Sequence, residues 1–292
     1  MKKISSLILA VLGLVSCNDV NLKADAYGNF EATEITISAE ANGKIEFLSV
    51  EEGDLLLPQA QVGLIDTLQL HFSKQLLLAN KGTIASKSAN VLSQKNVLEA
   101  QLKTAKIEKD RIHTMFAENA ATQRQVDEID GRVSVLQQQM QGVYTQNAPI
   151  LNELKSLDVQ IDRINDQIQK SKVINPIGGT VLTKYAEPAE LTAFGKPLYK
   201  IADLSEMTLR VFVSETQLEA LKIGQQVTVK IDGIDQMKTY DGSISWIASQ
   251  AEFTPKIIQT KEERVSLVYA VKVRVKNDGS LKIGMPAEMW LN

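Results

Sequence analysis

The chain has 292 residues, of which 44% are hydrophobic and 23% charged, and its formal net charge is -3. These values are ordinary for a folded protein, and the balanced charge gives no general attraction to nucleic acid. The sequence holds two histidines, His71 and His113, and one cysteine, Cys17. It therefore lacks a histidine and cysteine set with metal-site spacing, and it cannot form an intrachain disulfide.

The N-terminus has the features of a secretory signal. Two lysines precede an apolar run, residues 4–15, that is too short to span a bilayer as a mature helix. Residues 14–17 read Leu-Val-Ser-Cys and resemble the bacterial lipobox, in which a peptidase cleaves just before a cysteine that carries lipid. We expect residues 1–16 to be a lipoprotein signal peptide, Cys17 to be acylated and residues 17–27 to be a tether. The alternative is an ordinary signal peptide with a chance cysteine.

Residues 28–70 have the pattern of β structure. Residues 43–50 alternate apolar and polar side chains, as a half-buried strand does, and turn-forming residues follow at 52–54. A similar plan of glycine, strand, turn and strand recurs in residues 173–203. We predict one small β domain built from these two similar halves, with the intervening residues inserted between them.

The inserted stretch, residues 71–172, has the composition of helix. Only two of the sixteen glycines, Gly131 and Gly142, fall between residues 83 and 177, and glycine is disfavoured within helices. In the second part of this stretch apolar residues recur at alternating steps of three and four, with Asn147 out of pattern, which is typical of a left-handed coiled coil. They are Val126, Ile129, Val133, Leu136, Met140, Val143, Ile150, Leu154, Leu157, Ile161, Ile164 and Ile168.

The first part of the stretch has a matching apolar row with one residue in every seven. Its members are Leu77, Ile84, Val91, Leu98, Ala105 and Ile112, to which Leu102 and Phe116 add. A small and polar segment, 117–122, separates the two parts, with Thr122 as a candidate N-cap. Two runs of about fifty residues with a short loop predict an antiparallel hairpin about 75 Å long, its tip near 117–122. The first helix is the more basic one, and Pro149 is expected to kink or break the second.

Residues 204–292 read as further strands separated by glycine turns. The clearest strands are 208–213, 226–231, 242–247 and 267–275. Short strands with such turns predict a small β-barrel domain. The expected fold class is therefore mixed α and β, with a long coiled-coil hairpin inserted into a split β domain and a barrel after it.

With this organisation, the sequence resembles the HlyD or membrane-fusion family of periplasmic adaptors over nearly all of the mature chain. Residues 43–66 are similar to the first half of a biotinyl-lipoyl domain, and residues 174–203 are similar to the second half. True carriers hold a modified lysine at the turn between the halves. The hairpin replaces that turn here, so we expect a lipoyl-like domain without a carried cofactor.

Short motifs in the C-terminal part of the sequence resemble one group of adaptors within this family. Residues 253–256, 259–264, 267–269 and 284–286 read Phe-Thr-Pro-Lys, Gln-Thr-Lys-Glu-Glu-Arg, Leu-Val-Tyr and Gly-Met-Pro. They resemble adaptors that work with ABC-type exporters. No physical rule requires these residues, and a loop and a strand of the barrel would explain them equally well.

The hairpin tip also fits the resemblance. Adaptors that dock on TolC-like channels have Arg, then Leu four residues on, then Ser seven further, and this spacing gives Arg111, Met115 and Thr122 here. The resemblance implies that these three contact the channel, with Met and Thr as conservative replacements. A guanidinium suits backbone carbonyls or carboxylates, and Met gives an adaptable apolar contact. The alternatives are a solvated charge for Arg111 and a simple helix cap for Thr122.

The resemblance implies a periplasmic subunit, anchored to the inner membrane by lipid, that links an ABC-type transporter to an outer-membrane TolC-like channel. Several copies would pack as a ring. The sequence has no G-x-x-x-x-G-K-[ST], G-x-S-x-G or H-E-x-x-H motif, so we expect no catalytic, metal or cofactor site. The lysines of the first helix lie all around it without interleaved aromatics, which argues against nucleic acid.

Two alternative functions remain open. One is an adaptor of a resistance-nodulation-division exporter, although such adaptors usually continue into another β domain, whereas this sequence stops at Asn292. The other is a structural coiled-coil lipoprotein, which would need neither the split lipoyl-like halves nor the barrel.

Overall fold

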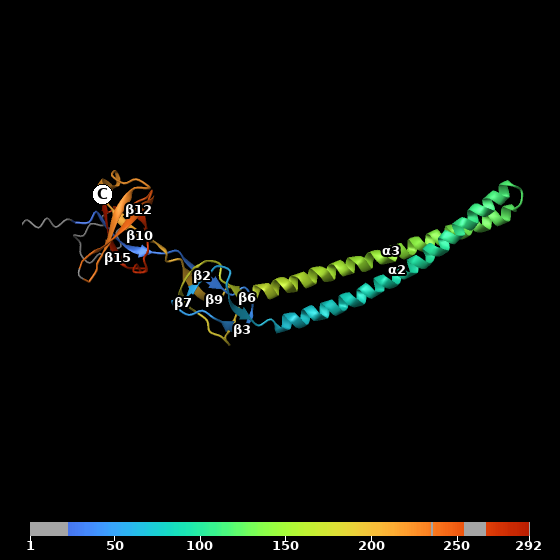
Figure 1. The fold of residues 1–292 in the computed structure, drawn as a ribbon, viewed down its shortest axis with the longest axis horizontal. Helices are drawn as coiled ribbons and strands as arrows, with labels where there is room; N and C mark the ends of the chain where they lie inside the picture. The colour runs from blue at the N-terminus through green and yellow to red at the C-terminus, as the bar shows by residue number, and fades with distance from the viewer. Residues whose placement is uncertain (1–22, 235, 254–266, 292) are drawn as a thin grey trace, which may run out of the picture.

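The computed structural model describes residues 23–234, 236–253 and 267–291. Figure 1 shows an elongated molecule with a barrel at one end, a smaller β unit in the middle and a helical hairpin at the other end. The expected signal peptide and Cys17 lie outside the described residues, as does 254–266 of the C-terminal stretch that resembles exporter adaptors.

The hairpin consists of α2, Leu68–Ala117, and α3, Gln123–Lys170. Its prediction from apolar periodicity is confirmed, because every predicted contact position of α3 is buried or half-buried. On α2 the same holds for the predicted row except at its last member, Phe116, which is 39% exposed. We call these two facing rows the seam.

Pro149 does not break the second helix, contrary to one of the two outcomes expected from the sequence. The helix α3 runs without interruption through this residue. Proline removes one backbone hydrogen bond and crowds the preceding turn, but Pro149 lies on an exposed face where water can reach the freed carbonyl. Seam contacts on both sides keep the helix continuous.

The middle β unit contains eight strands in two sheets of four. One sheet has the order β2-β9-β7-β4 and the other the order β6-β5-β3-β8. The strands are β2 Glu34–Ser38, β3 Gly43–Leu48, β4 Leu55–Leu56, β5 Gln61–Ile65, β6 Lys172–Ile174, β7 Gly179–Lys184, β8 Leu191–Thr192 and β9 Pro197–Ala202. Each sheet therefore combines strands from before and after the hairpin.

An internal two-fold repeat relates the two halves of this unit. Gly43 and Gly179 open β3 and β7, Leu55 and Leu191 open β4 and β8, and both pairs are separated by 136 residues. The backbone repeats as well, because the left-handed residues Gly53 and Gln59 recur at the same spacing as Ala189 and Gly195. The similarity of the halves read from the sequence is thus present in strand order and backbone conformation.

Buried Asn175 joins the two halves just after the hairpin. Its side-chain amide donates to the carbonyl of Leu57 at 2.8 Å and also to that of Ile177, and its Oδ1 accepts from the Tyr199 hydroxyl at 3.1 Å. Burial raises the pKa of Tyr199 to about 12, so the hydroxyl remains a donor. A buried amide with its hydrogen bonds made contributes to a unique packing, whereas an unpaired one is costly.

The barrel is closed, as the sequence predicted. Its strands follow the order β10-β1-β15-β11-β12-β14, and β14 pairs back to β10. The elements are β1 Ala26–Glu31, β10 Glu206–Val213, the short helix α4 Glu215–Leu218, β11 Gln226–Ile231, β12 Lys238–Ile247, β14 Leu267–Lys276 and β15 Pro286–Leu291, with β13 Glu252–Phe253 beside β14.

The first strand belongs to the barrel, which differs from the boundary read from the sequence. We expected residues 28–70 to lie in the middle unit and 17–27 to be a tether, but β1 pairs with β10 and β15. Gly28 is needed there because a Cβ at this position would lie 1.8 Å from the carbonyl oxygen of Arg210. Glycine and asparagine within a six-residue strand weaken the sequence signal for β structure.

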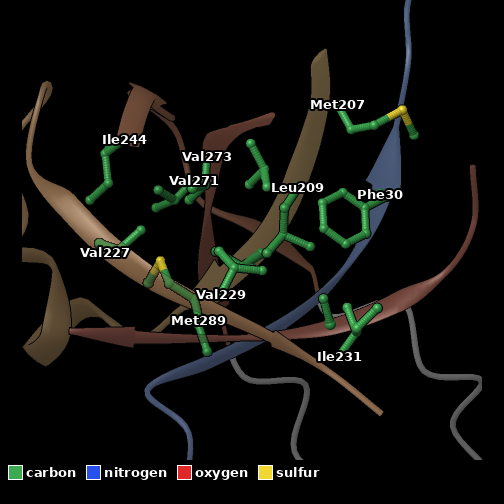
Figure 2. Packing of buried hydrophobic residues seen from close by; sticks show 14 of the residues in the cluster. Phe30, Met207, Leu209, Val227, Val229, Ile231, Ile244, Val271, Val273 and Met289 are labelled. Atoms are coloured by element: carbon green, nitrogen blue, oxygen red, sulfur yellow. The ribbon is translucent and has the colours of Figure 1, made fainter. Parts of the chain in front are cut away.

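Figure 2 shows how the barrel interior is filled by apolar side chains from several strands. Phe30, Leu209 and Met289 are fully buried there, and alternation along β10 points every second side chain inward. Burial of each such side chain contributes about 1.5–3 kcal/mol. This core holds the strands of the barrel together.

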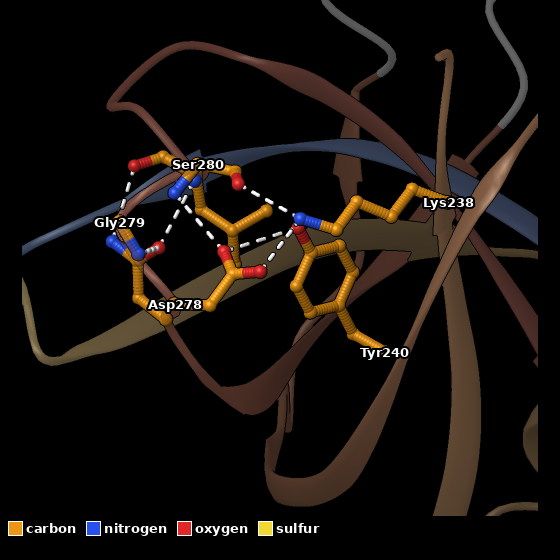
Figure 3. Close-up of polar contacts among 7 residues, drawn as sticks. Lys238, Tyr240, Asp278, Gly279 and Ser280 are labelled. Carbon is orange, nitrogen blue, oxygen red and sulfur yellow. Dashed lines mark hydrogen bonds and ion pairs between the residues drawn. The ribbon is translucent and has the colours of Figure 1, made fainter.

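One end of the barrel is held by a polar cluster, drawn in Figure 3. Lys238 at the start of β12 donates to Asp278 at 2.6 Å and to the Ser280 hydroxyl at 2.8 Å, in the loop that follows β14. This ammonium group, together with donors from Ser280, holds the pKa of Asp278 far below its usual range. The cluster is exposed, so its effect is local fixation of the loop.

Candidate functional site at the hairpin tip

The hairpin turn is short and fixed by backbone hydrogen bonds. Asn119 adopts a left-handed conformation with a φ of 58°. Its N–H donates to the carbonyl of Phe116 at 3.0 Å, and the N–H of Ala120 donates to that of Met115 at 2.8 Å. Asparagine tolerates this conformation better than most residues. These hydrogen bonds therefore satisfy two of the last carbonyl groups of α2 and fix the conformation of the turn.

Arg111 and Met115 lie four residues apart on α2, so they share a face of the helix. The Arg111 side chain is 68% exposed, and its Nη2 lies 2.7 Å from Oε1 of Glu108, one turn back. Met115 is 39% exposed. An exposed pair of this kind is weak, so the guanidinium can exchange Glu108 for another acceptor at little cost.

Thr122 caps the second helix. It accepts from the N–H of Gln125, and Oε1 of Gln125 accepts from the N–H of Thr122 at 2.8 Å, which completes a capping box. The N-cap expected from the sequence is confirmed. This role accounts for Thr122 by itself, and its place among the docking residues stays a hypothesis.

A polar contact that the sequence analysis missed joins the two helices below the tip. Asp130 on α3 accepts from Nε2 of His113 at 3.0 Å and lies 3.0 Å from Nζ of Lys109, both on α2. These partners, His113 first, lower the pKa of Asp130. The available signal was position, because Lys109 lies eight residues before the end of α2 and Asp130 lies seven residues after the start of α3.

The tip therefore offers a recognition surface. Its exposed groups are a guanidinium, a thioether and the aromatic ring of Phe116, on a rigid turn at the end of a rod. In the described part of the chain, no group of three or more His, Cys, Asp or Glu residues is placed to hold a metal ion. Such a surface can bind a partner through one charge and an apolar contact.

Comparisons with known proteins agree with this architecture. The structure is similar to that of MacA from Actinobacillus actinomycetemcomitans, with a TM-score of 0.55 at 19% identity, covering 90% of this chain and 76% of that one. It is also similar to the membrane fusion protein Spr0693 from Streptococcus pneumoniae R6, with a TM-score of 0.52 at 16% identity, covering 91% and 97%. No family model matches the chain.

The chain thus has the fold of the membrane fusion proteins, which is the resemblance inferred from the sequence. At the sequence level it is 25% identical over 285 residues to a UPF0194 membrane protein of Yersinia enterocolitica, covering 89% of this chain and 87% of that protein. A UPF0194 membrane protein of Citrobacter koseri is 23% identical over 304 residues. Among the helices that the structure describes, none combines the length and apolar character needed to cross a bilayer.

Proposed function

We propose that this protein is the periplasmic adaptor subunit of a tripartite export system. The observation that supports this most directly is the order of its parts along one axis, with a barrel, a two-fold β unit and a hairpin about 75 Å long (Figure 1). A rod on a compact base can reach from one membrane-bound assembly to another. That reach is what an adaptor requires.

In this proposal the middle unit is a biotinyl-lipoyl-like domain that the hairpin splits. The constant spacing of 136 residues between matching strands supports it, as does the exchange of strands between the two sheets. The hairpin leaves from the adjacent, paired strands β5 and β6. Two paired strands at its base would hold the direction in which the rod points.

In this proposal, the lipid anchor at the N-terminus sets the orientation of the molecule between the two membranes. Lipid on Cys17 would anchor the chain to the inner membrane, and β1 begins at Ala26, so at most about 30 Å of extended chain separates the anchor from the barrel. The barrel would then lie next to an inner-membrane transporter in the periplasm, and the tip would point to the outer membrane. The C-terminal resemblance favours an ABC-type transporter, and several copies would surround it as a ring.

The tip would dock a TolC-like outer-membrane channel through Arg111 and Met115, with Thr122 holding the turn. Arg111→Asp should abolish export, while circular dichroism, melting and membrane attachment stay unchanged, because the side chain is exposed and its one ion pair is weak. Reversing the charge should weaken docking more than Arg111→Ala does, since like charges across an interface repel.

The deciding measurement is photocrosslinking from position 115 in living cells. Capture of an outer-membrane channel protein supports the proposal. Crosslinks confined to an inner-membrane exporter would show that the rod points the other way. Co-purification of the transporter separates an ABC-type partner from a resistance-nodulation-division partner, and a purely structural lipoprotein would bring down neither.

The anchor is tested separately by mass spectrometry of the membrane-extracted protein. Diacylglycerol on Cys17 is the expected finding. A mature chain that keeps residues 1–16, or that is found soluble and unmodified, would contradict the lipid anchor without affecting the tip.

A further inference from the structure

Phe116 lies in the seam by sequence but is exposed in the structure. Counting by heptads, it follows Leu102 and Lys109 on α2, and Leu102 is only 6% exposed whereas Phe116 is 39% exposed. The helix ends one residue later, at Ala117, and the left-handed residue Asn119 turns the chain back. No further helical turn covers the ring, so an aromatic side chain reaches the surface at the end of the rod.

The surroundings of Phe116 form a small apolar surface. Met115 beside it is equally exposed at 39%. Ala117 and Ala120 of the same turn are exposed and Ala121 is half-buried, and we call Met115, Phe116, Ala117, Ala120 and Ala121 the tip cap. The side chains of Arg111 and Glu118 are exposed near it. An aromatic anchor with polar groups around it is the usual composition of a binding hot spot.

We infer that Phe116 is the principal apolar anchor of the hairpin tip for its outer-membrane partner. This inference rests on the proposed function and adds a residue to it. The tip cap lies at the far end of a rod about 75 Å long, where a partner must meet the molecule end-on. The chemistry of the cap fits a recess lined by small apolar side chains and edged by carboxylates or carbonyl oxygens, which would receive the ring of Phe116 and the guanidinium of Arg111.

The test compares Phe116→Ala with Phe72→Ala. Phe72 is a matched control because it is also an exposed phenylalanine of α2, at 54%, but lies near the base of the hairpin. Each variant has a photoreactive residue at position 115 in the full-length, membrane-anchored protein. We expect Phe116→Ala to lower the yield of crosslinked outer-membrane channel at least about tenfold, and Phe72→Ala to leave it unchanged. Phe116→Leu, which keeps an apolar side chain, should restore much of the yield.

The other outcomes would overturn the inference in distinct ways. A Phe116→Ala yield within about twofold of the parent, with the channel still captured, removes the anchor role and leaves the proposed function intact. A loss of yield that is accompanied by a lower helix melting temperature, and that Phe116→Leu does not rescue, makes Phe116 a structural residue of the tip. Capture of a second copy of this chain, or of no channel even by the parent protein, removes the proposed docking and this inference with it.

Discussion

The tip half and the base half of the hairpin differ in how their helices contact each other. The tip half, residues 98–117 and 123–140, contains a buried apolar cluster of Leu102, Ala105, Val133 and Leu136, with Leu98 and Met140 against it. The base half, residues 68–91 and 147–170, also buries Ile84, Ile161 and Ile164, but these lie among two interhelical polar pairs rather than in such a cluster. In the view of Figure 1 the two helices are more widely spaced towards the base than towards the tip.

One of the two polar pairs of the base half accounts for the residue that is out of pattern, Asn147. Lys81 of α2 pairs with Asp158 of α3, and the hydroxyl of Ser88 donates to Oδ1 of Asn147 at 2.9 Å. Asn147, the one exception in the predicted row, therefore has a partner. Polar pairs at seam positions fix the register of two helices but stabilise them less than apolar contacts do. The comparison teaches that one heptad pattern can give a tightly packed tip on a looser base.

The largest expected loss of stability comes from disrupting the apolar cluster of the tip half. Leu136→Asp should lower the free energy of unfolding of the hairpin by about 4 kcal/mol, because it places a charge in an apolar cluster without a partner. Leu154→Asp in the base half should cost less, since Leu154 is only half-buried. Melting of the helical circular dichroism signal measures both, and exposed Gln137→Asp, expected within about 0.5 kcal/mol, is the control. Equal losses at 136 and 154 would contradict the difference between the halves.

A smaller effect of opposite sign, a gain in stability, is expected from replacing a polar pair of the base half by apolar residues. Replacing both members of one polar pair, as Ser88→Ala with Asn147→Leu, should raise the stability of the hairpin by about 1 kcal/mol, because no polar group is left unpaired and apolar area is gained. Asn147→Leu alone should give less, since Ser88 then loses its acceptor. A double variant that melts below the parent would show that the pair is needed for more than register.

The smallest effect concerns pH in the tip half. Hydrogen bonds from His113 and Lys109 lower the pKa of Asp130 below its ordinary value of 3.8, so the carboxylate stabilises the folded state above that value and this contribution is lost as pH falls below it. Asp130→Asn should therefore flatten the dependence of melting temperature on pH between about 5 and 3. Asp127→Asn is the matched control, because Asp127 accepts from the neutral side chain of Gln123. Identical profiles for the two variants would remove the role given to Asp130.

Local pattern predicted much of this molecule. Alternating steps of three and four placed the seam of α3, and a threonine at the end of the small, polar segment 117–122 placed its N-cap. The strands 226–231 and 267–275 were predicted as short strands between glycine turns, and the structure places them within one residue of those bounds.

The features that were missed depend on long-range contacts. The strand β1 closes the barrel between β10 and β15, which are distant in sequence, so its own six residues give little signal. Buried Asn175 is polar, and its hydrogen-bond partners appear only once the two halves meet. Phe116 fits the heptad pattern, but that pattern does not show where the helix ends. For the tip, the family resemblance pointed to Arg111 and Met115, whereas the exposed aromatic ring of Phe116 could be recognised only in the folded structure.

The exchange of strands in the middle unit also orders the steps by which the chain folds. Leu55 pairs with Thr180 and Gly43 with Thr192, so neither half can complete its sheet until the whole hairpin has been synthesised. Closing so long a loop by diffusion is slow and entropically costly. Helices form through local contacts and need no such closure. Once α2 and α3 have paired, starting at the turn, β5 and β6 lie side by side. The remaining strands then have only a short distance to move before they pair. The hairpin, which projects outward in the finished protein, would thus first bring together the strands of the middle unit at its own base.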